Sequence, residues 1–172
     1  MGEGTGPATA LLYWEDSFRC ALADAVVVGC WPMGESEGVF HVITDRTIFH
    51  PQGGGQPWDT GLLCGPNGVF VVNEVRKDGE QVVHIGSFKE GAFSAGDLVS
   101  MEVNEVSRVL HARLHSAGHL LDCAVKSLHL PLIPGKGYHF PNSPFVEYKG
   151  VIPPDQRESV KAQLNQGEKL HK

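Results

Sequence analysis

The spacing of apolar residues changes from strand-like to helix-like near Asn104, and this change constrains the fold of the 172-residue chain most strongly. Before Asn104, short apolar or alternating runs recur between glycine-rich or polar turns, as in the strands of a small barrel or sandwich. The clearest runs are ALADAVVVGCW, VFHVITD, VFVVNEV, QVVHIG and LVSMEV. The Asp-Gly of RKDGEQ predicts a hairpin between the third run and the fourth.

After Asn104 the apolar residues recur every three or four positions and form one continuous stripe from Val106 to Leu128. Asn104 is suited to cap this helix, and Pro131 with the following IPGKG is suited to end it. A hairpin (GYHF, PNSP, FVEYKG) and a polar helix opened by Pro154 follow. Since two strands alone are marginally stable, we expect an α+β fold with residues 11–103 as one domain and residues 104–172 as an incomplete second domain.

Composition excludes several classes of protein. No run is long enough to cross a bilayer, and the N-terminus lacks a secretory pattern, so we expect a cytoplasmic protein with no membrane partner. The four cysteines form no C-x-x-C pair, and we expect reduced, mostly buried thiols. The net charge is −9 up to residue 104 and +3 beyond it, which makes the second part better suited to a polyanion; two merely solvated surfaces explain the same asymmetry.

A second stripe on the predicted long helix consists of His111, His115, His119 and Cys123, each four residues apart and about 100° around from the apolar stripe. Neighbours at i and i+4 can bind one metal ion, but residues eight apart lie about 12 Å apart, so only one adjacent pair can do so. The small residues SAG favour the pair His115 and His119. Gly118 costs about 1 kcal/mol inside a helix, which indicates a packing or site reason. Ordinary hydrogen-bonded histidines at the edge of the buried face are the alternative, and we expect Cys123 to be a core thiol.

The stretch TDRTIFHPQGGGQPWDTG, residues 44–61, contains three consecutive glycines. Such a run predicts a loop whose bare backbone N–H groups can approach a ligand. The Lys-Ser/Thr of a nucleotide P-loop does not follow, so we do not expect ATP or another nucleotide to bind here. A tight turn between barrel strands is the alternative.

Taken together, TIFHPQGGGQPWDTG and RLHSAGHLL resemble the free-standing alanyl-tRNA editing proteins, the AlaX family, and equally the editing domain of alanyl-tRNA synthetase. The family pattern is T-x-F-Y-P-x-G-G-G-Q-P-x-D-x-G followed by H-x-x-x-H, and His50 stands where tyrosine is usual. The hairpin GYHFPNSPFVEYKG is similar to the next segment of the family. The resemblance spans roughly residues 15–165 in the same order.

The resemblance implies a small glycine-rich β-barrel domain followed by a two-layer α+β editing domain. It implies Zn²⁺ bound by His115 and His119. The implied partner is mischarged tRNA for alanine, and the implied activity is trans-editing, in which serine or glycine is removed by hydrolysis of the aminoacyl ester.

The resemblance also implies roles in the glycine loop. Gly53, Gly54 and Gly55 are expected to bind substrate, Thr47 to contact the hydroxyl of serine, and Gln56 to orient water or the ester. A pocket that hydrogen-bonds this hydroxyl can reject alanine strongly, because alanine would leave buried polar groups unpaired. The alternatives are a strand residue chosen for β propensity at Thr47 and a loop-anchoring amide at Gln56.

The sequence departs from the family at its C-x-x-x-H motif. The histidines after Cys123 are His129, His139 and His171, and none follows a cysteine by four residues. We therefore expect a fragment, a natural short form or a defective zinc site. A catalytically weak or inactive tRNA-binding or interaction module is the second hypothesis. An unrelated zinc hydrolase is disfavoured, because HSAGH lacks the glutamate that metalloproteases carry beside the first histidine.

Overall fold

The computed structural model of the chain describes residues 6–34 and 38–167, which form two compact units. The barrel unit contains the described residues up to Gly53 together with Pro57–Val109. The histidine unit contains Gly54–Gln56 and the described residues from Leu110 on. The tip of the glycine loop therefore belongs to the histidine unit, although the strands before and after it in the chain belong to the barrel unit.

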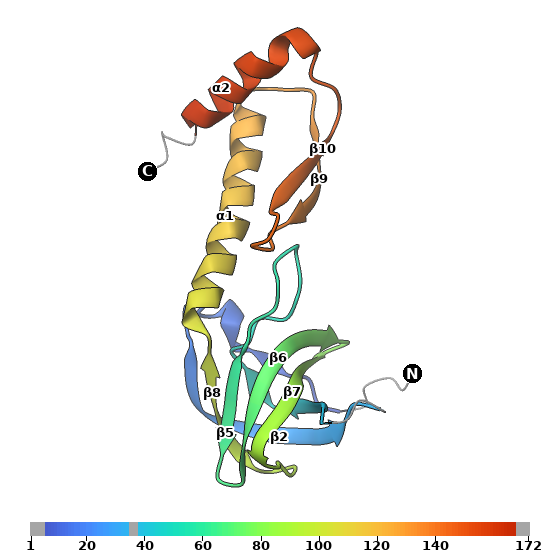
Figure 1. The fold of residues 1–172 in the computed structure, drawn as a ribbon, viewed down its shortest axis with the longest axis vertical. Helices are drawn as coiled ribbons and strands as arrows, with labels where there is room; N and C mark the ends of the chain where they lie inside the picture. The colour runs from blue at the N-terminus through green and yellow to red at the C-terminus, as the bar shows by residue number, and fades with distance from the viewer. Residues whose placement is uncertain (1–5, 35–37, 168–172) are drawn as a thin grey trace. The chain divides into compact units, whose positions relative to one another are not determined.

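The barrel unit is a closed barrel of antiparallel strands in the order β2-β3-β7-β6-β5-β8 (Figure 1). Closure pairs both sides of every barrel strand and so removes exposed sheet edges. A short parallel pair, β1 with β4, and the 3-10 helix η1 accompany the barrel. The expected barrel is thus confirmed. The elements are β1 (Ala10–Leu11), η1 (Leu12–Trp14), β2 (Ala21–Pro32), β3 (Phe40–Thr44), β4 (Arg46–Thr47), β5 (Gly61–Gly65), β6 (Gly68–Asp78), β7 (Gln81–Gly91) and β8 (Leu98–Val103).

The interior of the barrel is filled by large apolar side chains. Phe49, Phe70, Leu63 and Met101 are buried there together with valines from most of the strands. Burial of each such side chain contributes about 1.5–3 kcal/mol, so this cluster gives the unit a core of its own.

One hairpin of the barrel was predicted from the sequence, whereas one strand was not. The predicted hairpin is confirmed: Asp78 pairs with Gln81, and Gly79 has φ +58° in the two-residue turn. Strand β5 was not predicted, because its sequence GLLCG has a glycine at each end. The first of these, Gly61, allows β8 to approach, since a Cβ there would lie 2.0 Å from the Glu102 oxygen.

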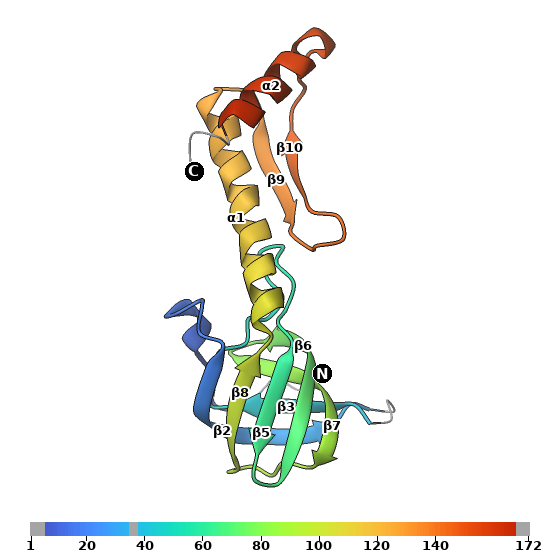
Figure 2. The same cartoon turned by 60° about the vertical axis from the view of Figure 1, so that its left-hand side comes forward.

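In the histidine unit, the β9–β10 hairpin runs alongside the long helix α1 (Figures 1 and 2). Asn104 caps this helix as predicted, because its Oδ1 accepts a hydrogen bond from the Ser107 N–H at 3.1 Å. Strand β9 begins earlier than expected and includes IPGKG, which pairs with β10. None of the described helices is long and apolar enough to cross a membrane. The elements are α1 (Glu105–Ser127), β9 (Ile133–Tyr138), β10 (Phe145–Lys149), η2 (Pro154–Gln156) and α2 (Arg157–Gly167).

The predicted apolar stripe of α1 is only partly covered: Leu114, Leu121, Ala124 and Leu128 are half-buried, whereas the other three members are exposed. Val106 is 82% exposed and Leu110 is 44% exposed. The buried or partly buried side of the helix within the histidine unit contains His115, Gly118 and Asp122. The hairpin brings His139 and Tyr148 to this side, and the apolar Val125 is buried there as well.

The cysteines are free, as expected. Cys20, Cys30 and Cys64 are partly buried in the barrel unit, and burial raises the pKa of each thiol. The expectation of a core thiol at Cys123 was wrong, because this side chain is exposed. It lies about 100° around α1 from the side that the hairpin covers.

Candidate functional site

The base of the glycine loop is held by a buried ion pair in the barrel unit. The Asp59 carboxylate accepts hydrogen bonds from the His50 backbone N–H at 2.6 Å and from the Arg108 guanidinium. Arg108 also donates to the backbone oxygens of Ile48 and Ser17. Both charged side chains are almost completely buried, which is tolerable only because they are paired and hydrogen-bonded. The loop therefore starts from a fixed base.

The tip of the loop lies against the backbone of the hairpin in the histidine unit. Gly54 and Gly55 have φ of +57° and +78°, a region that favours glycine. The His139 N–H donates to the Gly55 oxygen at 2.9 Å. A Cβ on Gly55 would lie 2.3 Å from the Gly137 oxygen, so this position requires glycine for packing.

Gln56 follows the glycines and is buried beside the first histidine of the predicted pair. Its Oε1 lies 2.8 Å from His115 Nδ1. An amide oxygen only accepts hydrogen bonds, so Nδ1 is the donor here, and in the neutral ring Nε2 then carries the lone pair. This is the tautomer in which His115 can bind a cation through Nε2.

The two predicted ligands, His115 and His119, approach each other through the edges of their rings. Their Nε2 atoms are 3.1 Å apart, whereas the ring centroids are 4.9 Å apart. Two nitrogens that bind one tetrahedral zinc ion at 2.0–2.1 Å are about 3.3 Å apart, so the pair fits a single ion. Residues 6–34 and 38–167 contain no group of three or more His, Cys, Asp or Glu side chains placed to hold a metal.

A third imidazole, His139, lies at the site, although sequence analysis did not identify it as a site residue. Its ring stacks on that of His115 with centroids 4.7 Å apart. A Cβ on Gly118 would lie 2.4 Å from His139 Cε1, which explains the glycine in the middle of α1. Burial and the neighbouring His119 lower the pKa of His139, so this ring is neutral at pH 7.

A cavity of about 130 Å³ opens at these rings. It can hold an ion with a few water molecules, since water occupies about 30 Å³ in the liquid. Gly54 lines it, together with both predicted ligands. Asp122 and His139 also line it.

Thr47 belongs to the barrel unit, and its hydroxyl is completely buried. It donates to His84 Nε2 at 2.8 Å and accepts a hydrogen bond from the Phe49 N–H at 3.0 Å. His84 Nδ1 donates in turn to the Val42 oxygen at 3.1 Å, and burial lowers the pKa of His84 to about 4. The histidine unit thus brings together Gly54, Gln56 and the two predicted ligands, whereas Thr47 and Gly53 lie in the barrel unit.

Comparison with known proteins matches residues 32–107 to the family model described as tRNA synthetases class II (A). The chain is 40% identical over 85 residues to the alanine–tRNA ligase of Francisella philomiragia subsp. philomiragia, which covers 49% of this chain and 10% of the ligase. The alanine–tRNA ligase of Francisella tularensis subsp. novicida matches with the same identity and coverage. The matching region thus spans about a tenth of each relative. The family match includes the glycine loop and ends before His115.

Proposed function

We propose that the chain, which carries a domain related to alanyl-tRNA synthetase, removes wrongly attached serine or glycine from tRNA for alanine. The reaction is hydrolysis of the aminoacyl ester. The similarity to alanine–tRNA ligases supports tRNA for alanine as the substrate class. The observation that carries the proposal is the convergence of the His115 and His119 Nε2 atoms, 3.1 Å apart, beside the tip of the glycine loop.

The resident metal in this proposal is Zn²⁺, held by His115 and His119. Neutral imidazole is a common zinc ligand, and the hydrogen bond to Gln56 makes Nε2 the His115 nitrogen that would bind the metal. When bound, zinc supplies Lewis-acid chemistry, which makes a bound water more acidic and polarises an ester carbonyl. In this proposal Gln56 orients His115, which differs from the role in orienting water or the ester that the family resemblance implies.

In this proposal the backbone of the glycine loop contacts the ester. Gly53 and Gly54 are exposed, which supports a role for their backbone in contacting substrate, whereas Gly55 is used for packing. Water adds to the ester carbonyl carbon, and the bond from that carbon to the terminal ribose oxygen breaks. The ribose oxygen takes a proton, and the free amino acid leaves.

A non-catalytic tRNA-binding module is the second candidate function. An Nε2–Nε2 separation of 3.1 Å also fits a direct hydrogen bond between the two imidazoles, which needs no metal. Lys126, Lys136 and Lys149 are exposed in the histidine unit and suit contacts with phosphate groups.

Release of serine from seryl-tRNA for alanine tests the two functions. We expect His115→Ala and His119→Ala to reduce the release rate at least a hundredfold. His129→Asn is the matched control: it removes an exposed histidine after the same helix, and asparagine tolerates the φ of +51° found there. Binding of the same tRNA measured by gel shift, without release of serine by the wild type, would favour the non-catalytic module.

A further inference from the structure

We infer that Tyr138, Phe140 and Phe145 form a stacking platform for the unpaired bases at the 3′ end of tRNA. This platform lies on the face of the β9–β10 hairpin that points away from α1. The inference rests on the proposed function, because it names the surface that holds the RNA beside the site of hydrolysis. None of the three residues belongs to the family match, which ends at residue 107.

The three rings of the platform lie nearly parallel. The Tyr138 ring stacks on that of Phe140, with centroids 4.5 Å apart and an angle of 10° between the planes. It also stacks on the Phe145 ring, with centroids 5.4 Å apart and an angle of 20°. Although Tyr138 covers part of the Phe145 ring, Phe145 is 42% exposed. A flat nucleic-acid base can therefore extend the stack at Phe145.

The platform and the candidate metal site use opposite faces of the same hairpin. His139 points toward α1, since a Cβ on Gly118 would lie 2.4 Å from its Cε1. Successive residues of an extended strand point to opposite faces, so Tyr138 and Phe140 point away from α1. Phe145 is the cross-strand partner of Tyr138 and shares its face. The platform therefore flanks an imidazole of the site, which places the last bases of an RNA close to the ester.

The charge on this part of the hairpin suits a phosphate backbone. A groove that continues along the two strands from the platform is lined by Lys136 and Lys149 together with Glu147. All three side chains are exposed, and the two lysines leave the groove with a net positive charge. Proteins that bind single-stranded nucleic acid combine such a groove with aromatic rings on which bases stack. This combination favours RNA over an apolar protein segment as the occupant.

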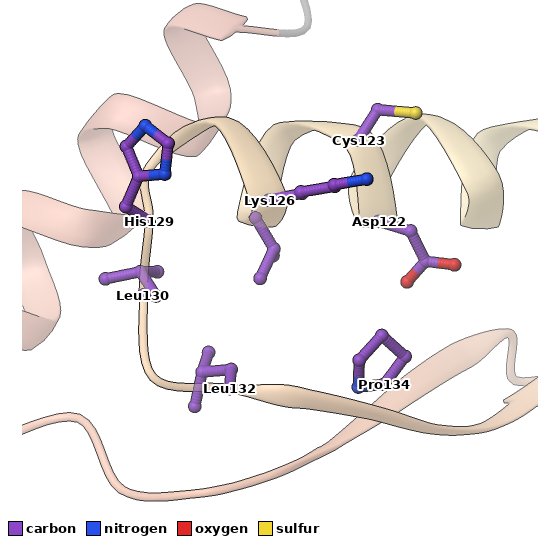
Figure 3. A pocket seen from close by; sticks show the side chains of 8 residues that line it. Asp122, Cys123, Lys126, His129, Leu130, Leu132 and Pro134 are labelled. Carbon is purple, nitrogen blue, oxygen red and sulfur yellow. The ribbon is translucent and has the colours of Figure 1, made fainter.

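A cavity between α1 and β9 is the competing place for a base. It has a volume of about 610 Å³, and Leu130, Leu132 and Pro134 lie opposite the helix (Figure 3). The Asp122 carboxylate points toward Pro134, and Lys126 from the same helix also lines the cavity (Figure 3). These two charges cancel, and the described lining residues include no Phe, Tyr or Trp. The platform is therefore the better surface for stacking.

Binding of the single-stranded RNA ACCA, followed by fluorescence anisotropy of a dye on its 5′ end, tests the platform without any hydrolysis. Phe145→Ala should weaken binding at least about fivefold, which is the smaller effect of losing one stacked base. Phe145→Tyr should bind like the wild type. Phe145→Leu should bind as weakly as Phe145→Ala, because leucine keeps an apolar surface but has no flat ring. Wild-type affinity in Phe145→Leu would overturn the inference.

Leu132→Ala is the matched control, because it removes an apolar side chain from the competing cavity and should leave ACCA binding unchanged. Equal losses in Leu132→Ala and Phe145→Ala would place the base in the cavity and overturn the inference. Lys149→Gln should lower the slope of log affinity against log salt by about 0.7, as expected for one lost phosphate contact with a single strand. An unchanged slope would overturn the placement of the RNA along the groove.

The kinetics of serine release separate this inference from the proposed function. Phe145→Ala should raise KM for seryl-tRNA with little change in kcat, because the platform holds the RNA and does not touch the ester. A fall in kcat with unchanged KM would overturn the inference, and the helical circular-dichroism signal checks that each variant is folded. If the wild type releases no serine, the proposed function fails, and ACCA binding still decides the role of the platform. If ACCA binds the wild type no better than Phe145→Ala, the platform fails and the proposed function stands.

Discussion

Protonation of His84 should destabilise the barrel unit as the pH falls below 6.5. The side chain is completely buried, and both of its ring nitrogens are hydrogen-bonded inside the unit. Burial lowers the pKa of His84 from 6.5 to about 4. A proton on Nε2 would also remove the acceptor for the Thr47 hydroxyl.

The sign and the size of the effect follow from the two pKa values. Between pH 6.5 and pH 4 the unfolded chain binds a proton that the folded chain does not, so the free energy of unfolding increases with pH across this range. The contribution of His84 is fully present above pH 6.5. About 2 kcal/mol is lost at pH 5 and about 3 kcal/mol at pH 4.

Urea unfolding followed by tryptophan fluorescence measures this effect in one unit. Trp14, Trp31 and Trp58 are the three tryptophans of the sequence, and each belongs to the barrel unit. Other groups titrate in the same range, so the comparison is between the wild type and His84→Gln, with His119→Gln in the histidine unit as the control. An identical dependence on pH in the wild type and in His84→Gln would show that His84 does not cause the loss of stability.

Three further predictions concern residues around the site. Asp59→Ala should lower the free energy of unfolding of the barrel unit by about 3–5 kcal/mol, measured by tryptophan fluorescence, because it leaves the buried Arg108 unpaired; a loss below 1 kcal/mol would contradict this. Thr47→Val should slow deacylation of seryl-tRNA and glycyl-tRNA equally, since the hydroxyl is shared with His84 and buried; a selective loss on seryl-tRNA would support the hydroxyl-reading role implied by the family resemblance. Gly118→Ala should destabilise the histidine unit in thermal circular dichroism, because its Cβ would overlap the His139 ring; stabilisation, as helix propensity alone predicts, would show that the overlap does not matter.

Local residue patterns predicted much of the secondary structure. Alternation located β2, β3, β6, β7 and β8, and the period of α1 with its cap at Asn104 gave the long helix. Strand β5 was not predicted, because its short, glycine-flanked sequence shows no strand pattern. It forms a strand by pairing with β6 and β8. Pairing between segments that are distant in the chain depends on the whole fold, so it cannot be predicted from a short stretch of sequence.

The face of α1 shows a second limit of local patterns. Counting apolar residues selects the stripe that contains Val106 and Leu110, yet these side chains are exposed. The hairpin covers the side that contains His115, Gly118 and Asp122, and the sequence of a single helix cannot reveal which side a later hairpin covers.

The sequence predicted which residues belong to the candidate site better than it predicted how they are arranged. Spacing and the small SAG turn identified His115 and His119, whose convergence is now visible, but their binding of zinc stays a prediction. The hydrogen bond from His115 to Gln56 joins residues 59 positions apart. The place of His139 could have been suspected only from the glycine at Gly118, because nothing in its own spacing marks it.

The most direct test of the account couples metal occupancy to hydrolysis. Chelator-treated chain is titrated with zinc while release of serine from seryl-tRNA for alanine is followed. We expect the rate to rise in proportion to bound zinc in the wild type and to stay at the background level in His115→Ala and His119→Ala. A rate that is independent of zinc, or one that survives both substitutions, would contradict it.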